Sequence, residues 1–150
     1  MELKRCAECG ADLNGKACLE YFNKMLAWDF ADFAGVGQVH HLTVLCYYLQ
    51  HPGKYSTEGL KKAIGILKDV LEGNLTDKDL YREESEVFSS SKRTWKVSGT
   101  PENHGVYSPK VKWTLTVSDV VQGGLEKYPE NVRKWAQLIY KDLKASGNTE

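Results

Sequence analysis

The sequence predicts an α+β fold that is mainly helical, with an N-terminal zinc knuckle and a small β-hairpin before the last helix. Four stretches place apolar residues three or four positions apart, which is the spacing of one buried helix face. Two later stretches alternate apolar and polar residues, as a half-buried strand does. The length is typical of one domain, so we expect residues 1–150 to fold as a single domain, with residues 1–15 as a metal-binding knuckle packed on the helical body.

The first half of the chain is predicted to form three helices, over residues of about 16–33, 38–50 and 56–73. The second helix ends near residue 50 because Pro52 disfavours helical geometry in the residue before it. Ser56 is a suitable N-cap for the third helix. The buried stripe of the first helix is expected to consist of Leu19, Phe22, Leu26, Phe30 and Phe33, and that of the third of Leu60, Ile64, Leu67 and Leu71.

The second half begins with a short fourth helix that starts at Thr76, and residues 85–92, which contain a serine run, are expected to form a loop. The alternating residues 95–97 and 111–117 flank a glycine-bounded loop, which predicts the β-hairpin. Pro129 suits the first turn of a last helix. The buried stripe of that helix is expected to consist of Val132, Trp135, Ile139 and Leu143.

Composition and charge argue against some classes of protein. Hydrophobic residues make up 41% and charged residues 27%, which is ordinary for a globular protein. Basic and acidic residues both number 20, and this balance argues against a dedicated nucleic-acid binder or an electrostatic membrane anchor. No apolar run reaches the roughly 18 residues that span a bilayer, and the first residues do not resemble a secretory signal. We therefore expect a cytoplasmic protein with reduced cysteines.

Three of the four cysteines fall close together near the N-terminus. Two thiolates two residues apart, as in Cys6-x-x-Cys9-Gly10, can hold one tetrahedral ion, and the glycine lets backbone N–H groups turn toward the sulfurs. A redox Cys-x-x-Cys is disfavoured because no strand precedes the pair. Two unrelated surface cysteines are the remaining alternative. Cys18, at the start of the first helix, is a candidate for a third ligand.

Helix geometry selects among the other candidates, which are His40, His41, Cys46 and His51. If the first two helices form an antiparallel hairpin that turns near Val36, His51 lies only ~4.5 Å from the level of Cys18 along the helix axes. His40 lies ~21 Å and Cys46 ~12 Å from that level, too far for a bond of ~2 Å. A cap of the last helical carbonyls is the alternative role for His51. The sequence thus predicts one structural Zn²⁺ held by Cys6, Cys9, Cys18 and His51.

One face of the second helix is both polar and aromatic, since it carries His40, Val44, Tyr47 and His51. Such a face can line a pocket in which His40 acts as a general base. Asp29 and Asp32 are the acids expected to approach His40 across the hairpin. The favoured interpretation is an interior face whose polar tips find backbone partners. Cys46 is likewise expected to be a buried apolar residue rather than a ligand.

Four motifs occur together along the chain: Cys-x-x-Cys-Gly at residues 6–10, a further cysteine at a helix start, the segment 40–52, and Leu-Thr-Val-Ser-Asp-Val at residues 115–120 before a helix with a tryptophan. The segment 40–52 contains His-His-Leu-Thr-Val and Tyr-Tyr-Leu-Gln-His-Pro. This combination resembles an uncharacterised bacterial family of unknown function, DUF5946. The resemblance implies a shared fold and shared site residues without an assigned activity. Its histidines at both His40 and His51 leave the fourth ligand open. Leu45 stands where an acidic residue is expected in many members, so a catalytic site that needs that acid would be missing here.

Three functions are compatible with the sequence. The favoured one is a zinc-stabilised helical module that binds a protein or small-molecule partner, because four protein ligands leave no open position for catalysis. Enzymatic activity is left open, as a metal- or His-dependent hydrolase with its site on the His40/Tyr47 face. The third is weak nucleic-acid binding, which the charge balance disfavours. It would use basic residues interleaved with aromatic ones, namely Lys92, Arg93, Trp95, Lys96, Lys110, Lys112 and Trp113.

Overall fold

A computed structural model describes residues 5–11, 17–31, 39–73, 75–88 and 95–149. In this part of the chain, no helix combines the length and the apolar character that crossing a bilayer requires. The helices follow one another in the order α1 (Cys18–Ala31), α2 (His40–Leu49), the short 3₁₀ helix η2 (Pro52–Lys54), α3 (Thr57–Gly73), α4 (Asp77–Phe88), α5 (Val117–Gln122), the 3₁₀ helix η3 (Leu125–Lys127) and α6 (Tyr128–Ala145).

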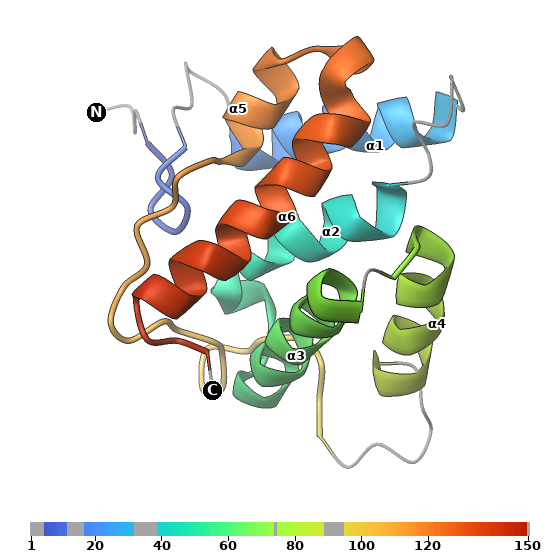
Figure 1. Cartoon of the computed structure of the whole chain (residues 1–150). Helices are drawn as coiled ribbons and strands as arrows, with labels where there is room; N and C mark the ends of the chain where they lie inside the picture. The colour runs from blue at the N-terminus through green and yellow to red at the C-terminus, as the bar shows by residue number, and fades with distance from the viewer. Residues whose placement is uncertain (1–4, 12–16, 32–38, 74, 89–94, 150) are drawn as a thin grey trace.

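The helix α2 lies at the centre of the molecule and contacts α1, α3, α4 and α6 (Figure 1). Six of its ten residues are buried, and a helix that is apolar around most of its circumference needs neighbours on several sides. The long helix α6 crosses α2, while α1 and α5 pack together at one end of the molecule (Figure 1). The predicted stripe of α6 is confirmed, because Val132, Trp135, Ile139 and Leu143 are all almost completely buried.

Local capping explains where three helices begin. The Ser56 hydroxyl accepts the backbone N–H of Gly59 at 2.9 Å, so Ser56 caps α3 as predicted. The Thr76 hydroxyl accepts the backbone N–H of Asp79 at 3.2 Å, and the Asp79 carboxylate accepts the backbone N–H of Thr76, which starts α4. Thr116 and Asp119 form the same reciprocal pair at the start of α5.

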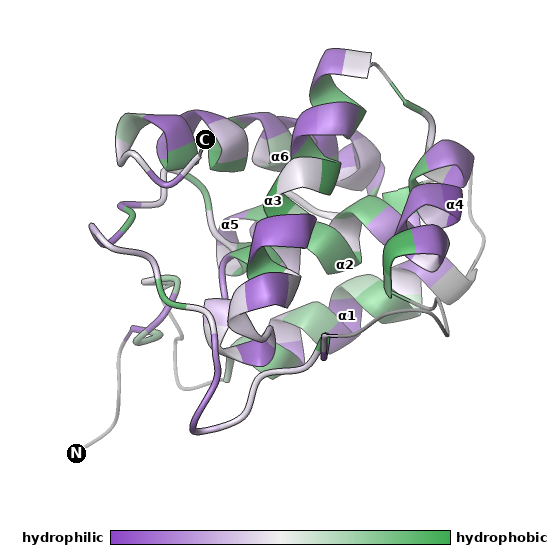
Figure 2. Ribbon diagram, turned by 90° about the horizontal axis from the view of Figure 1, so that it is seen from below, coloured by the Kyte–Doolittle hydropathy of each residue, from purple (hydrophilic) through white to green (hydrophobic). Residues whose placement is uncertain are grey.

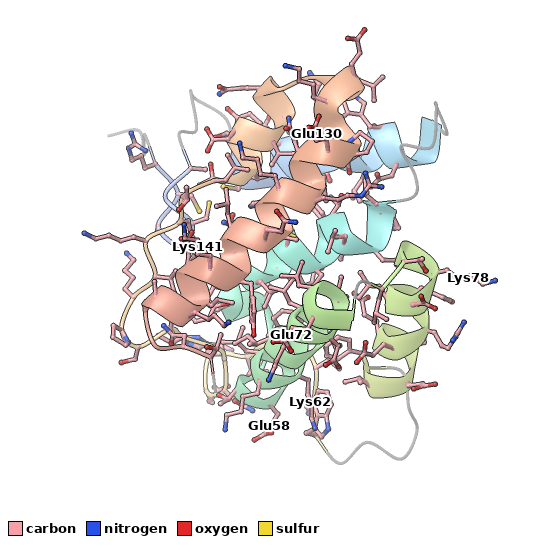
Figure 3. The ribbon with its side chains drawn as sticks, in the orientation of Figure 1. Glu58, Lys62, Glu72, Lys78, Glu130 and Lys141 are labelled. Atoms are coloured by element: carbon pink, nitrogen blue, oxygen red, sulfur yellow. The ribbon has the colours of Figure 1, made fainter. Side chains whose placement is uncertain are left out.

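Hydrophobic and hydrophilic residues occupy different faces of the outer helices (Figure 2). The charged residues labelled in Figure 3 extend outward from α3, α4 and α6, away from the helical body. These helices therefore bury one stripe and leave the opposite face to water.

Two local predictions in the helical part were wrong. Leu19 is 52% exposed, whereas Tyr21 and Met25 of α1 are buried, so the buried face of this helix is rotated from the predicted one. The helix α4 continues to Phe88, so residues 85–88 are helical and not a loop; residues 89–92 lie outside the described residues. Ser85 lies within α4, because serine is only mildly unfavourable in a helix.

The predicted β-hairpin does not exist, and the α+β fold class was therefore wrong. Among the residues that the structure describes there is no strand, and the fold is helical. The segment after Trp95 pairs with the turn before α3 instead of with residues 111–117, through an isolated bridge between Tyr55 and Ser98. The backbone N–H of Ser56 donates to the Val97 carbonyl at 2.8 Å in the same contact.

The second predicted strand is an extended segment that lies over helices. Val111 is buried, and Trp113 and Leu115 are half-buried, which explains the alternating pattern. Its polar groups bond to side chains: the backbone N–H of Thr114 donates to Asp142 of α6 at 2.7 Å, and the Gln50 side chain donates to the Leu115 carbonyl at 2.7 Å. Alternation reports one buried face of an extended chain, but it does not say whether a strand or a helix covers that face.

Candidate metal centre

The first two cysteines lie on a tight turn that directs one backbone N–H at a sulfur. The backbone N–H of Gly10 donates to the Cys6 carbonyl at 2.9 Å, and that of Cys6 donates to the Ala11 carbonyl at 3.0 Å. Gly10 has a φ of 75°, a conformation that favours glycine. The chain then turns so that the Ala11 N–H donates to the Cys9 sulfur at 3.4 Å. The predicted role of the glycine after the second cysteine is therefore seen in the structure.

The third cysteine stands at the first residue of α1 and faces the turn. The Cys18 Sγ lies 3.6 Å from the Cys9 Sγ, and both residues are at most 9% exposed. The start of α1 is held by the Glu20 carboxylate, which accepts the backbone N–H of Ala17 at 2.7 Å. A sulfur at a helix start has a short and well-defined reach, which suits a ligand position.

The histidine at the end of α2 reaches the same cluster. His51 is 4% exposed, and its Nε2 lies 3.6 Å from the Cys6 Sγ. Its Nδ1 donates to the Tyr47 carbonyl at 2.7 Å, one turn earlier in the helix. Because a carbonyl can only accept, Nδ1 carries a proton, and Nε2 is the ring nitrogen that faces the sulfurs. A backbone carbonyl bound to the other ring nitrogen is the usual way in which a metal-ligating histidine is oriented.

These four side chains form one cluster that can hold a metal ion. The three Sγ atoms and a ring nitrogen of His51 all lie within 4.8 Å of one another, and Cys6 is the only one of the four residues that is not buried. The cysteines are not joined by disulfides. The structure therefore brings together the four residues that helix geometry selected from the sequence, although the predicted turn near Val36 lies outside the described residues.

The protonation of the cluster fits a cation. Hydrogen bonds from Cys18 and Cys9 hold the pKa of the Cys6 thiol well below its usual range, whereas the hydrogen bond with Cys6 raises the pKa of Cys18 to about 12. Burial lowers the pKa of His51, but hydrogen bonds to Cys6 and Cys9 outweigh it and raise the pKa to about 10. One thiolate thus forms easily while its neighbours keep their protons, since like charges this close repel. A divalent cation removes that repulsion and allows all three sulfurs to ionise.

The other histidine of interest, His40, lies at the opposite end of α2 in a separate network. Its Nδ1 is 2.9 Å from the Asp29 carboxylate, whose side chain is 1% exposed. The Tyr128 hydroxyl donates to the other carboxylate oxygen at 2.8 Å and lies 2.6 Å from the Thr43 hydroxyl. The approach of Asp29 to His40 was predicted, and Asp32 lies outside the described residues. Tyr128 was missed because it is 85 residues from Thr43 and carries no local signal.

The remaining predicted positions have structural surroundings. Tyr47 is 2% exposed and stacks on Phe22 with ring centroids 4.0 Å apart, as expected of an interior face. Cys46 is fully buried, as predicted for an apolar core residue. Of the basic and aromatic set proposed for nucleic-acid binding, Lys92 and Arg93 lie outside the described residues. The structure places Lys110, Lys112 and Trp113 beside the Cys6–Cys9 turn.

The fold and the cluster define a helical protein with a Cys₃His group that can hold a metal ion. The family model described as "Family of unknown function (DUF5946)" matches residues 4–144, and the chain belongs to this family. No curated protein and no solved structure matches the chain. The family assignment confirms the resemblance seen in the motifs and adds no activity.

Proposed function

We propose that Cys6, Cys9, Cys18 and His51 bind one structural Zn²⁺ and that the protein is a non-enzymatic binding module built around it. The distances between the donor atoms carry this proposal. A regular zinc tetrahedron with bonds of about 2.3 Å to sulfur and about 2.0 Å to nitrogen separates two sulfurs by about 3.8 Å and a sulfur from a nitrogen by about 3.5 Å. The Cys9 and Cys18 sulfurs are 3.6 Å apart, and the Cys6 sulfur is also 3.6 Å from the His51 Nε2.

The chemistry of the donors supports zinc over other metals. Thiolates with one imidazole in a tetrahedral arrangement suit Zn²⁺, whereas hard cations such as Mg²⁺ and Ca²⁺ select oxygen ligands. Four converging protein donors leave no open coordination position, which is the arrangement of structural zinc sites. Because thiolate ligands require reduced cysteines, the proposal includes a reducing compartment such as the cytoplasm.

The ion would join three segments of the chain: the turn at residues 6–10, the start of α1 and, more than 30 residues later, the end of α2. Figure 1 shows these segments on the same side of the molecule. Zinc would then hold the knuckle, residues 1–15 in the predicted organisation, against the helical body, so that residues 1–150 behave as one domain. A site of this kind contributes its binding free energy to folding.

A binding module is favoured over a hydrolase by the surroundings of the alternative site. The side chain of Tyr47 is buried against Phe22 and close to His51, so it does not share an accessible face with His40. The Asp29 carboxylate that contacts His40 also binds Tyr128, a network that joins α1, α2 and α6. These contacts support a role for His40 in packing the helices.

The test is metal analysis of protein purified without chelator, followed by replacement of the metal with Co²⁺. One zinc per chain is expected, and the Co²⁺ form should show the absorption of a tetrahedral site with thiolate ligands. Cys18→Ser should abolish the tetrahedral spectrum, and Cys46→Ser is the matched control because Cys46 lies outside the cluster. Protein that binds no metal, or a spectrum that Cys18→Ser leaves unchanged, would contradict the proposal.

A further inference from the structure

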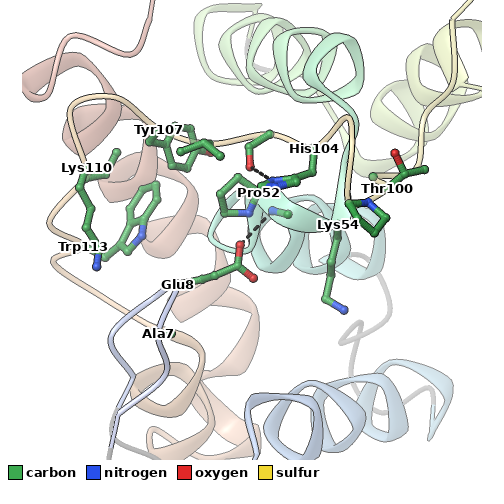
Figure 4. A pocket seen from close by; sticks show the side chains of 15 residues that line it. Ala7, Glu8, Pro52, Lys54, Thr100, His104, Tyr107, Lys110 and Trp113 are labelled. Carbon is green, nitrogen blue, oxygen red and sulfur yellow. Dashed lines mark hydrogen bonds between the residues drawn. The ribbon is translucent and has the colours of Figure 1, made fainter.

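A pocket of about 720 Å³ lies directly beside the candidate metal centre (Figure 4). Three segments build it: the turn that carries Ala7 and Glu8, the start of η2 at Pro52, and the irregular chain of residues 99–113. Pockets that hold small organic ligands have volumes of about 300–1,000 Å³, so this one has the capacity for a small molecule.

The proposed zinc ligands position two of the three walls. Glu8 lies between Cys6 and Cys9, and Gly53 follows His51 by two residues. The two walls meet where the backbone N–H of Gly53 donates to the Glu8 carboxylate at 2.9 Å, a bond drawn in Figure 4. A metal that ties Cys6 and Cys9 to His51 also holds these walls together, so the inference rests on the proposed function for the rigidity of the pocket.

The third wall is fixed by close backbone contacts. A Cβ added to Gly105 would lie 2.8 Å from the Pro52 carbonyl oxygen and 2.7 Å from a methyl of Leu60. A Cβ added to Gly99 would lie 2.3 Å from the Gly53 carbonyl oxygen. The irregular chain therefore sits against η2 and α3 at distances that only glycine permits, and its position is determined by packing.

One end of the pocket is aromatic. Tyr107 is buried and meets the half-buried Trp113 edge to face, with ring centroids 5.6 Å apart. Val111 is buried beside them, and Val106 on the rim is 66% exposed. Figure 4 shows Tyr107 and Trp113 together on one side of the pocket, with Lys110 next to the indole. This end suits a flat ring, because aromatic side chains stack on planar ligands.

The adjoining end carries more basic than acidic side chains. A second pocket of about 500 Å³ shares Ala7, Glu8 and the chain from Lys110 to Trp113 with the first, and it is also lined by Arg5 and Lys112. Its lining has three basic and two acidic side chains, so one positive charge is in excess. Glu8 accepts from Gly53, Asp119 accepts from the backbone of Thr116, and Arg5 donates to the Gly10 carbonyl at 3.1 Å.

Lys54 does not belong to this basic end. It lines the first pocket, but its ammonium lies 5.9 Å from the centre of the Tyr47 ring. Three basic side chains line the second pocket: Arg5, Lys110 and Lys112. The net charge of the whole chain is zero. With Glu8 and Asp119 in the same lining, a small excess of positive charge lies next to the aromatic end.

We propose that the two adjoining pockets bind a small organic anion in which an aromatic ring is joined to a phosphate or a carboxylate. The ring stacks on Trp113, and the anionic group pairs with Lys110 and Lys112. A ligand of this kind stacks its ring on the aromatic end and pairs its anionic group with the two lysines. A neutral or cationic ligand could make only the aromatic contact.

The test measures binding by isothermal titration calorimetry to the zinc-loaded full chain. The probes are adenosine 5′-monophosphate and indole-3-acetate, which carry the ring with a phosphate and with a carboxylate, together with adenosine and inorganic phosphate as half-ligands. Saturable one-to-one binding of either ring-bearing anion, at least about tenfold tighter than both half-ligands, is expected. Which of the two binds tighter shows which combination of ring and anionic group the pocket prefers. Absence of binding by both, or equal binding of adenosine and its monophosphate, overturns the proposal.

Binding to variants of Lys110 and Trp113 tests whether the ligand occupies these two pockets. Lys110 is exposed, and Lys110→Gln should weaken binding about tenfold, which is the effect of losing one charge-assisted contact. Lys78 on α4 is also exposed, and the matched control Lys78→Gln should leave the affinity unchanged. Trp113→Phe keeps an aromatic ring and should weaken binding less than Trp113→Ala does. A dissociation constant that neither Lys110→Gln nor Trp113→Ala alters would place the ligand elsewhere and refute the inference.

Failure of the zinc proposal and failure of the pocket proposal give different results. Zinc content is measured in the same samples, so zinc-free protein that still binds the anion would contradict the structural zinc and leave the pocket standing. Protein with one zinc per chain that binds neither ring-bearing anion would contradict the pocket and leave the metal centre standing.

Discussion

The most direct perturbation of the proposed centre is His51→Ala. The change removes a nitrogen donor that lies 3.6 Å from the Cys6 sulfur, together with a ring that is 4% exposed and packs 4.3 Å from the Tyr47 ring. Loss of even an outer partner of a metal ligand weakens metal binding about 10–100-fold, so loss of the ligand itself should weaken it at least about 100-fold. The metal-linked part of the free energy of unfolding then falls by about 2.7 kcal/mol.

That loss corresponds to a melting temperature roughly 5–11 °C lower for a domain of this size. The informative quantity is the drop in melting temperature that a chelator causes, measured by scanning calorimetry with zinc and with chelator. Wild-type protein should show a large drop, and the drop of His51→Ala should be smaller by roughly 5–11 °C, because its metal contributes about 2.7 kcal/mol less to the free energy of unfolding.

His40→Ala is the matched control. It breaks the contact with the buried Asp29 carboxylate and should therefore destabilise the protein in its own right. Its chelator-induced drop should nevertheless equal that of the wild type, since His40 lies outside the cluster. If His51→Ala kept one zinc per chain and the full drop, while His40→Ala lost both, the assignment of the fourth ligand would be refuted.

Three further substitutions test the packing by urea unfolding. Gly65→Ala should stabilise the protein by about 0.5–1 kcal/mol, because the residue is exposed within α3 and an added Cβ meets nothing within 4 Å; a loss of stability would contradict the described helix. Gly99→Ala should destabilise by at least about 1 kcal/mol, since its Cβ would lie 2.3 Å from the Gly53 carbonyl oxygen, and an unchanged midpoint would show that the segment is not held there. Tyr128→Phe should cost about 1.5–3 kcal/mol by removing a donor from the buried Asp29 carboxylate, and a neutral effect would argue against that network.

Much of the helical architecture could be predicted from local signals. Ser56 and Pro129 mark helix starts by their own backbone and hydrogen-bonding preferences, and the stripe of α6 follows from the helical repeat. Leu19 shows the limit of this reasoning. Its spacing fits an apolar face, yet the packing of α1 against its neighbours leaves the side chain 52% exposed. Periodicity finds an amphipathic helix more reliably than it finds the exact edge of the buried face.

The hairpin was mispredicted for a reason of the same kind. The alternation around Val111 and Trp113 reports an extended chain with one covered face, and the cover is α6 and the end of α2 rather than a second strand. The backbone donors and acceptors of an extended chain must form hydrogen bonds, and here the Asp142 carboxylate accepts from the Thr114 N–H while the Gln50 amide donates to the Leu115 carbonyl. No local pattern in residues 95–117 records which partner is available.

The sequence by itself determined the components whose cause is local: the helix starts, the amphipathic stripes and the cysteine pair whose glycine turns backbone donors toward sulfur. It also reduced the number of candidate metal ligands, because the rise per residue of a helix determines which side chains lie at the same height as Cys18. Only the tertiary structure decided that Tyr128 joins Asp29 and Thr43 across the helices, and that the chain after Trp95 closes a pocket beside the metal centre. The physical reason is that such meetings depend on how packed helices are arranged, and residues distant in sequence carry no record of that arrangement in their own neighbourhood.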